Sequence, residues 1–457
     1  MLKKKPLIAA MSAALAVGAM FSGSAHAVRI SENTTGQVLL GDMYIARATD
    51  YNSTRVTVVN PSMTDAVKAK LVFRSKKHSD ECKDLILYLP PGDVAYVDVR
   101  LNPAGQPEIW SDDDSILASR RSDGTVQFAS QITGGFTSPM VLPRTQPAAD
   151  TCAQGHVEVV GAYAVGGTVT GLASGAPNVV IAQGMSKHQL IRVFDTNKGA
   201  LNAAGNNITN DGAARGGQDH ADRVRLKGDI TIASATDRVR ASMAALREGV
   251  NQRTAGVSTF TITNPTFDVT VGAETLIGEN FSLAGDTVTD ISGALSTTNL
   301  FNFYAKGSTG FEVTFSTKYR YMNPADRYAN RASSTLVNYS PPFEQNGEVQ
   351  YNVALWDTQE RSAPALVTDV CIVSPCSVSV VAGSYLIHEV NYEALTGTST
   401  WDPSSGWFRM NLVPRAGVDR FGANWTAANG VPASGWTHYY AQSGVGMNST
   451  TSVFGRP

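Results

Sequence analysis

Three consecutive aspartates, Asp112, Asp113 and Asp114, form the densest acidic segment of the chain. Hard cations such as Ca²⁺ are bound by several carboxylate oxygens that converge from a flexible loop, so these residues are candidate calcium ligands. Three adjacent side chains do not all point the same way, and a solvated acidic loop is the competing interpretation. The sequence indicates no other metal ion and no cofactor.

A second set of candidates is aromatic. The final 60 or so residues hold four of the six tryptophans, and these are candidate glycan contacts: Trp401, Trp407, Trp425 and Trp436. An aromatic ring face can stack on the face of a pyranose ring, so exposed tryptophans would form a platform for sugars. In β-sandwiches the same residues commonly pack in the core, and that alternative stays open.

The usual signatures of enzymes are missing from the chain. It has no Gly-x-Ser-x-Gly nucleophile elbow, no Gly-Lys pair for a phosphate-binding loop and no Gly-x-Gly-x-x-Gly after a strand. The nearest approach to a zinc-peptidase motif begins at His388-Glu389, but Tyr392 stands where the second histidine would be. In a strand, adjacent side chains such as these two point to opposite faces. We therefore expect a protein without catalytic residues.

Four cysteines, Cys82, Cys152, Cys371 and Cys376, are an even number, which in an exported protein indicates disulfides. Cys371 and Cys376 are close enough in sequence to close a small loop around Pro375, which leaves Cys82 to pair with Cys152. A metal site is the alternative, but neither pair has Cys-x-x-Cys spacing or a neighbouring histidine.

The first 27 residues have the pattern of a secretory signal peptide. Lys3, Lys4 and Lys5 precede an apolar run, and the segment ends on Ala25-His26-Ala27, an A-x-A cleavage pattern. The apolar run is at the short end for a membrane anchor, which is the alternative. We expect an exported protein at the cell surface or outside the cell, with the periplasm as the other location.

The composition of the chain indicates which kinds of partner the protein is not built to bind. Charged residues are 17% of the chain and hydrophobic residues 42%, which indicates packed structure rather than disorder. Removing the three leader lysines takes the formal net charge from −2 to −5, and no basic patch for nucleic acid is evident. No later segment is apolar for long enough to span a membrane as a helix. We expect no nucleic-acid partner.

Alternating apolar and polar residues predict a mainly β protein built from antiparallel sandwiches. In Val67–Arg74 the odd positions are apolar and the even ones mostly charged, the pattern of a half-buried strand. Val349 to Leu355 and Phe408 to Leu412 repeat the alternation. Turn residues such as Pro90-Pro91-Gly92-Asp93 separate short strands, as in an immunoglobulin-like sandwich.

Several segments also resemble a known group of proteins. These segments are Thr35–Leu40, Thr57–Pro61, Val67–Arg74, Asp84–Val94, Leu355–Asp357 and Gly406–Met410. They are similar to secreted "cell surface" proteins of Gram-negative bacteria with an immunoglobulin-like N-terminal part. The resemblance implies a surface protein and implies no catalytic residue, because none is established for the group.

We expect four parts along the chain. Residues 1–27 are the cleaved leader, and residues 28–147 form an immunoglobulin-like sandwich. Residues 148–255 form a loop-rich middle region, and residues 256–457 a β-rich C-terminal domain. Within the middle region, Val239, Met243 and Leu246 have helical spacing, which predicts one short helix near 236–248 that ends at Gly249.

These observations favour a non-catalytic structural or adhesive protein of the cell surface or extracellular matrix. It would act through contacts with other surface proteins or with further copies of itself. One alternative is a carbohydrate-binding protein that uses the C-terminal aromatics. Another is an exported hydrolase whose two carboxylates come from distant strands.

Overall fold

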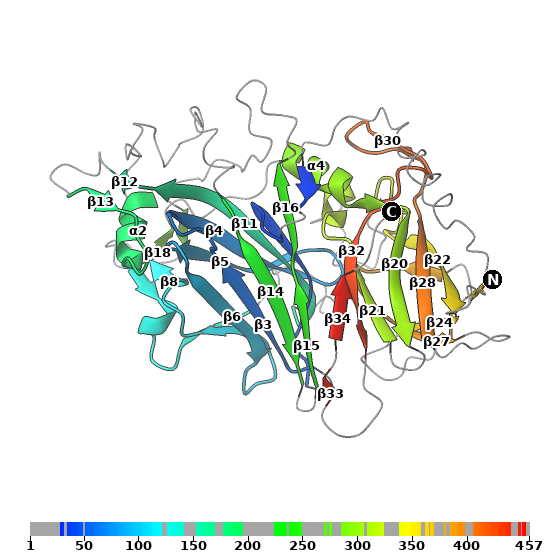
Figure 1. Ribbon diagram of the computed structural model, residues 1–457, viewed down its shortest axis with the longest axis horizontal. Helices are drawn as coiled ribbons and strands as arrows, with labels where there is room; N and C mark the ends of the chain where they lie inside the picture. The colour runs from blue at the N-terminus through cyan, green and yellow to red at the C-terminus, as the bar shows by residue number, and fades with distance from the viewer. Residues whose placement is uncertain are drawn as a thin grey trace, which may run out of the picture.

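The computed structural model describes residues 28–31, 34–48, 51–120, 126–140, 152–169, 177–194, 224–234, 237–248, 269–271, 274–276, 285–305, 309–323, 338–357, 362–364, 366–369, 379–380, 384–397, 405–439, 447–448 and 450–453. Antiparallel β-sheets dominate this part, which confirms the predicted mainly β sandwich class. Figure 1 shows two β lobes side by side. The leader, Cys371, Cys376 and Trp401 lie outside the described residues.

The first lobe is a sandwich of a six-stranded and a seven-stranded sheet. In order of pairing, the six strands are β1 (Val28–Ile30), β16 (Ala244–Glu248), β2 (Val38–Ile45), β11 (Gln154–Gly166), β4 (Asp65–Ser75) and β5 (Glu81–Leu89). The seven are β10 (Phe136–Pro139), β7 (Pro107–Ser111), β6 (Val94–Leu101), β3 (Ser53–Val59), β14 (Lys227–Ala233), β15 (Asp237–Ser242) and β33 (Met447–Asn448). Side chains from both sheets share one buried apolar cluster, so the sheets pack face to face.

Strands of the predicted middle region belong to this first sandwich. β11 lies between β2 and β4, and β14 pairs with β3 over seven residues. β15 and β16 extend the two sheets. The first sandwich therefore draws on residues 148–255 as well as on 28–147.

The predicted helix near 236–248 is wrong, because this segment forms β15 and β16. Val239, Ala241, Met243 and Ala245 alternate with more exposed residues and all join the core of the sandwich. The spacing of Val239, Met243 and Leu246 alone fits a helix. When the buried Ala241 and Ala245 are included, the buried residues recur at every second position from Val239 to Ala245, as in a strand. Pairing with β14 and then β2 overrides the local helical preference.

One predicted disulfide is present in the described part of the chain. Cys82 on β5 bonds to Cys152 just before β11, with an S–S distance of 2.09 Å and 5.8 Å between their Cα atoms. Both residues lie in the core of the first sandwich. The bond closes a loop of 70 residues, from β5 around the edge of the sandwich to β11.

The second lobe is also a two-layer sandwich. One sheet has the order β20 (Asn299–Ala305), β28 (Ser405–Val413), β22 (Val349–Asp357) and β23 (Ser362–Pro364), with β26 (Ser384–Leu386) also on β22. The other has the order β25 (Ser379–Val380), β24 (Leu366–Asp369), β27 (Val390–Gly397), β21 (Thr309–Thr314), β32 (Ser434–Tyr439) and β34 (Thr450–Val453). The predicted apolar alternation is confirmed, because Val353, Leu355, Phe408 and Met410 all face the buried cluster between these sheets.

Two α-helices, α2 (Lys187–Phe194) and α4 (Gly285–Leu295), cover parts of the six-stranded sheet on its outer side. Leu190 and Phe194 of α2 pack with Tyr88 of β5, and Ile291 and Leu295 of α4 pack on a cluster from β1, β2 and β16. No helix in the described ranges is long and apolar enough to cross a membrane.

The second lobe covers a further part of that outer side, where it meets polar side chains. Thr314 on β21 donates a 2.6 Å hydrogen bond from its hydroxyl to the carbonyl oxygen of Asp42 on β2. The hydroxyl of Ser434 on β32 donates to the Asp42 carboxylate, and Thr314 also contacts the carboxyl of Glu312. All four residues are buried. We call these four the junction cluster.

The surroundings of Glu312 favour its protonated form. Burial away from water raises its pKa well above the ordinary value, and the charge of nearby Asp42 raises that pKa further. The Thr314 hydroxyl has one proton and meets two oxygens, so both contacts are satisfied when a protonated Glu312 donates to it. Protonation of Glu312 therefore reduces the repulsion between its carboxyl group and Asp42.

A buried ion pair lies beside the junction cluster. Arg74 on β4 donates from Nε to Glu158 on β11 at 2.7 Å, and its guanidinium lies 4.6 Å from the ring centroid of Tyr319 in the second lobe. The Glu389 backbone N–H of the second lobe donates to the Lys76 carbonyl oxygen of the first. Arg74 of β4 thus lies against the second sandwich.

The disulfide yields a stability prediction. We expect the double substitution Cys82→Ala with Cys152→Ala to lower the free energy of unfolding by about 4 kcal/mol, because the unfolded chain regains the freedom of a long loop. Urea titration followed by tryptophan fluorescence measures the change. A double variant with the same stability as the parent would contradict the prediction.

The protonated Glu312 predicts how stability depends on pH. Its folded pKa is raised, so the folded protein holds a proton that the unfolded chain releases above about pH 4.5, and the free energy of unfolding falls as pH rises through that interval. Glu312→Gln keeps the hydrogen bonding and removes this dependence. We expect the variant to gain stability relative to the parent between pH 5 and 8, as measured by urea titration at each pH.

The control is Asp112→Asn, which changes an exposed carboxylate. The buried His156 contributes a slope of the opposite sign below about pH 6.5, and it does so equally in both proteins. Burial and the charge of Arg74 lower the pKa of His156 to about 3, so its unfolded form gains a proton first as pH falls below about 6.5. An unchanged slope above pH 5 in Glu312→Gln would show that Glu312 is ionised in the folded protein.

Candidate functional site

The outward side of the sheet β20-β28-β22 carries a regular array of side chains. Inward residues of these strands fill the core of the second sandwich, so the alternate residues must point outward. Strand register places them in three rows across the sheet. The rows are Phe303–Trp407–Trp356, Phe301–Arg409–Ala354 and Asn299–Asn411–Asn352.

The first row is aromatic on all three strands. Trp356 and Trp407 stack with ring centroids 4.0 Å apart and an angle of 6° between their planes. Phe303 lies directly opposite Trp407 on the edge strand and is 70% exposed. Each indole covers one face of the other and both remain half-buried. Exposed aromatic rows of this kind mark sites of interaction, because they leave apolar surface in water.

The strands approach closely beside the indole pair. Gly406 is opposite Asp357, and a Cβ atom at Gly406 would collide with the Trp356 carbonyl oxygen. A residue without a side chain is therefore required at this point. The close approach holds β28 against β22 where the two tryptophans stack.

The third row consists of amides. Asn411 donates from Nδ2 to the Thr298 carbonyl oxygen at 3.1 Å and to Asn299 Oδ1 at 3.3 Å. Asn352, at the other end of the row, is exposed. An asparagine side chain has both a donor and an acceptor, so the row can satisfy either kind of group on a ligand.

One further row extends the array beyond the asparagines. Gln350 on β22 lies between Val413 on β28 and Tyr385 on β26. Tyr385 is 46% exposed. From Trp356 to Gln350 the strand rises about 20 Å, since each residue adds roughly 3.4 Å. We call the four rows together the outer face.

The outer face combines two kinds of contact. Aromatic rings stand at both ends and amides lie between them, while Arg409 provides the charge. The Arg409 guanidinium lies 5.3 Å from the ring centroid of Trp356, so it is oriented by a cation–π contact. Such a face can stack on flat apolar surfaces and hydrogen-bond to neutral polar groups.

The predicted tryptophans divide between this face and the interior. Trp407 belongs to the outer face. Trp425 is 8% exposed and donates from Nε1 to Asp419 at 2.9 Å, and Trp436 is 2% exposed in the core. Neither buried ring can meet a sugar, so these two residues are removed from the candidate glycan contacts.

Other residues of the outer face were missed in the sequence, although a signal for some was present. Once Phe408 and Met410 are assigned to the core, strand alternation sends Trp407 and Arg409 outward. The same argument places Trp356 outward beside Leu355. Phe301 and Phe303 lack this signal, because their strand also has Asn302 on its buried side.

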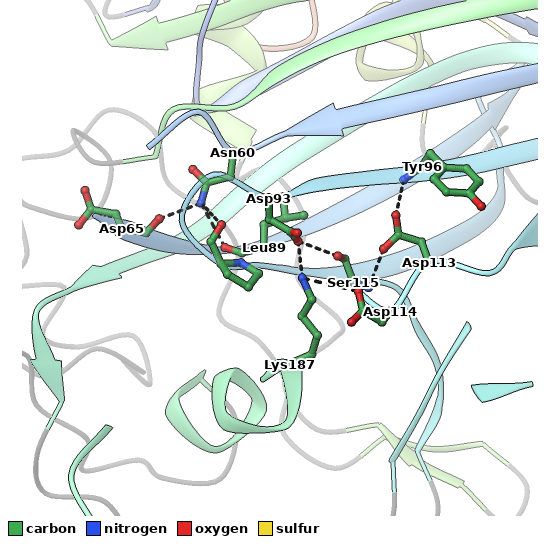
Figure 2. Close-up of polar contacts among 10 residues, drawn as sticks. Asn60, Asp65, Leu89, Asp93, Tyr96, Asp113, Asp114, Ser115 and Lys187 are labelled. Atoms are coloured by element: carbon green, nitrogen blue, oxygen red, sulfur yellow. Dashed lines mark hydrogen bonds and ion pairs between the residues drawn. The ribbon is translucent and has the colours of Figure 1, made fainter. Parts of the chain in front are cut away.

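The aspartates at 112–114 lie at one end of the first sandwich, between β7 and the following segment. Figure 2 shows Asp113 accepting hydrogen bonds from the backbone N–H of Tyr96 at 3.0 Å, and Ser115 N–H donates to its other oxygen at 2.8 Å. Burial raises the pKa of Asp113. Asp112 is exposed. Asp113 thus orders the turn rather than facing a shared site.

A lysine ammonium neutralises the carboxylates nearby. Lys187, the first residue of α2, donates to Asp93 at 2.5 Å, and its Nζ lies 3.8 Å from Asp114 (Figure 2). The Ser115 hydroxyl also donates to Asp93, at 2.7 Å. A protein cation therefore stands among these carboxylates. Within the described ranges, no three metal-binding side chains are grouped so that they could hold an ion.

The His388–Glu389 pair lies in the second lobe, close to the junction. Burial, together with nearby lysines, lowers the pKa of His388 to about 2, so its imidazole is neutral. Glu389 is buried, and its backbone N–H and C=O pair with Lys76 and Phe315. The backbone N–H of Glu389 thus links the second lobe to the first.

The contact of Lys187 with Asp93 predicts an effect on the stability of the protein. We expect Lys187→Met to lower the free energy of unfolding by about 1–3 kcal/mol, because Asp93 loses a charged hydrogen-bond partner where it is partly buried. Chemical denaturation measures the loss, and Lys227→Met at an exposed lysine is the control. Stabilisation of the parent protein by added Ca²⁺ would contradict the assignment of Lys187 as the cation of this corner.

No known protein family, curated protein or solved structure matches this chain significantly. The function of the protein is therefore inferred from the geometry of the outer face and from the features of the sequence.

Proposed function

We propose that the protein is a non-catalytic adhesive protein of the cell surface or extracellular matrix, with the outer face as its contact surface. The observation that carries the proposal is the aromatic row Phe303–Trp407–Trp356, which lies on the side of the sheet away from the core. Core packing does not require these rings, since Phe408, Met410 and Leu355 already fill the interior.

The architecture supports an adhesive function. A contact surface keeps its side chains in fixed positions when strands or helices carry it. The outer face lies on paired strands rather than on loops. The junction cluster and the contact of the Arg74 guanidinium with the Tyr319 ring fix the second sandwich to the first. Asp42 and Glu312 are engaged by hydroxyls within the junction, whereas the aromatic row of the outer face includes the exposed Phe303.

The sequence adds support for a location outside the cytoplasm. The leader pattern at residues 1–27 indicates export, and the Cys82–Cys152 disulfide suits an oxidising compartment. Both features agree with the resemblance to secreted surface proteins. An adhesin must meet its partner at the surface, so localisation is part of the test.

The test compares cells that produce the parent protein with cells that produce Trp356→Ala with Trp407→Ala. We expect the parent in the surface or matrix fraction, and we expect the variant to reduce cell attachment to the level of a deletion strain. Its abundance and fraction should be unchanged, because these half-buried side chains lie outside the core. Immunoblotting of the fractions and a crystal-violet attachment assay provide the measurements.

The matched control is Met63→Ala with Val180→Ala, which removes two exposed apolar side chains from the first lobe. These residues are 64% and 63% exposed. We expect this control to attach like the parent. A parent protein found only as a monodisperse periplasmic species, or equal loss of attachment in both variants, would overturn the proposal.

A further inference from the structure

We infer that the outer face binds an extended, neutral polysaccharide chain. The inference rests on the proposed adhesive function and names its partner. It depends on three properties of the face: the kinds of side chain, the low charge and the length. Each distinguishes a sugar chain from other macromolecules.

The side chains match the two kinds of surface on a sugar ring. A pyranose has a C–H face, which packs on an aromatic ring, and a rim of hydroxyls, which both donate and accept hydrogen bonds. Trp356, Trp407 and Phe303 offer ring surface at one end of the outer face. Asn352 and Gln350 offer amides beside it that can pair with a hydroxyl in either role, and Asn411, whose N–H groups donate within the protein, offers its amide oxygen as an acceptor.

The charge of the face disfavours polyanions. Arg409 is the charged side chain among its twelve positions, and it is oriented towards the ring of Trp356. Nucleic acids and acidic peptides are held by several Lys or Arg side chains along a groove. A neutral, hydroxyl-rich ligand needs no such array, so the chemistry fits a neutral sugar chain.

The length of the face favours a polymer over a single sugar. Tyr385 lies opposite Gln350, about 20 Å along the sheet from Trp356. A chain of several sugar rings laid along the strands would contact the indole pair at one end and Tyr385 at the other. The amides of the middle rows would then face its hydroxyls.

The distribution of apolar groups argues against a protein partner. Protein–protein contacts concentrate their apolar residues in a central, fully desolvated cluster with a polar rim. Here the aromatic side chains stand towards the two ends, and a row of amides crosses the middle. This order is the reverse of such an interface and suits a ligand with polar and apolar surface along its whole length.

Native affinity electrophoresis tests the inference on the full mature protein. The gels contain a mixed-linkage β-glucan, dextran, galactomannan or alginate, the last as an anionic polymer. We expect at least one neutral polymer to retard the parent protein. Trp407→Ala should weaken that binding about tenfold, as expected when a stacking ring is lost.

Two further variants separate contact from folding. Asn352→Ala should weaken binding severalfold, because it removes an exposed amide without changing the core. Val418→Ser, at an exposed apolar position outside the outer face, should bind like the parent. Melting temperatures of all variants should match that of the parent within about 2 °C. Equal binding by Trp407→Ala and the parent would overturn the inference.

Failure of this inference can be distinguished from failure of the adhesive proposal. If none of the four polymers retards the protein, or if alginate alone does, the neutral polysaccharide is excluded as the ligand. If attachment is still lost in Trp356→Ala with Trp407→Ala, the outer face remains the adhesive surface and its partner is a protein or an anionic glycan. If attachment is also unchanged, both proposals fail.

Discussion

The burial of charged residues on the outer side of the six-stranded sheet is the constraint on which the arrangement of the molecule depends. Asp42, Arg74 and Glu158 would lie at the surface of an isolated sandwich. The second sandwich encloses them, and it supplies hydroxyls from Thr314 and Ser434 as partners. Buried charges without partners cost several kcal/mol, so the Ser434 hydroxyl stabilises the Asp42 carboxylate where the second sandwich covers it.

This match determines which surface of the second lobe remains open. The sheet containing β21, β27 and β32 meets the first lobe, and apolar residues such as Tyr392 and Trp436 join the core of that lobe. The opposite sheet, β20-β28-β22, consequently carries the outer face away from the junction (Figure 1). The polar junction and the aromatic face are thus the two sides of one sandwich, and the core of Phe311, Phe408 and Leu355 lies between them.

The sequence predicted strands well where only one face of the strand is buried. It did not predict burial of the other face where another part of the chain covers the strand. Val353, Leu355, Phe408 and Met410 were assigned correctly because alternation reports a single buried side. Lys68 and Lys70 looked like the exposed side of a half-buried strand, yet both are enclosed. The local alternation of apolar and polar residues does not indicate whether a distant segment covers the charged side chains. The same limit explains the buried Trp425 and the missed Phe303, whose exposure depends on the fold around them.

The pairing of β33 with β15 has a consequence for the order in which the molecule assembles. Met447–Asn448 lies parallel to Asp237–Arg238, so residues about 200 positions apart complete one edge of the first lobe. Contacts of such long separation form late, because a long stretch of chain must first be brought together. Until then β15 presents an unpaired backbone edge, which is a template for association with other chains. While the chain folds, this part of the β15 edge therefore stays open to association until Met447–Asn448 has reached it.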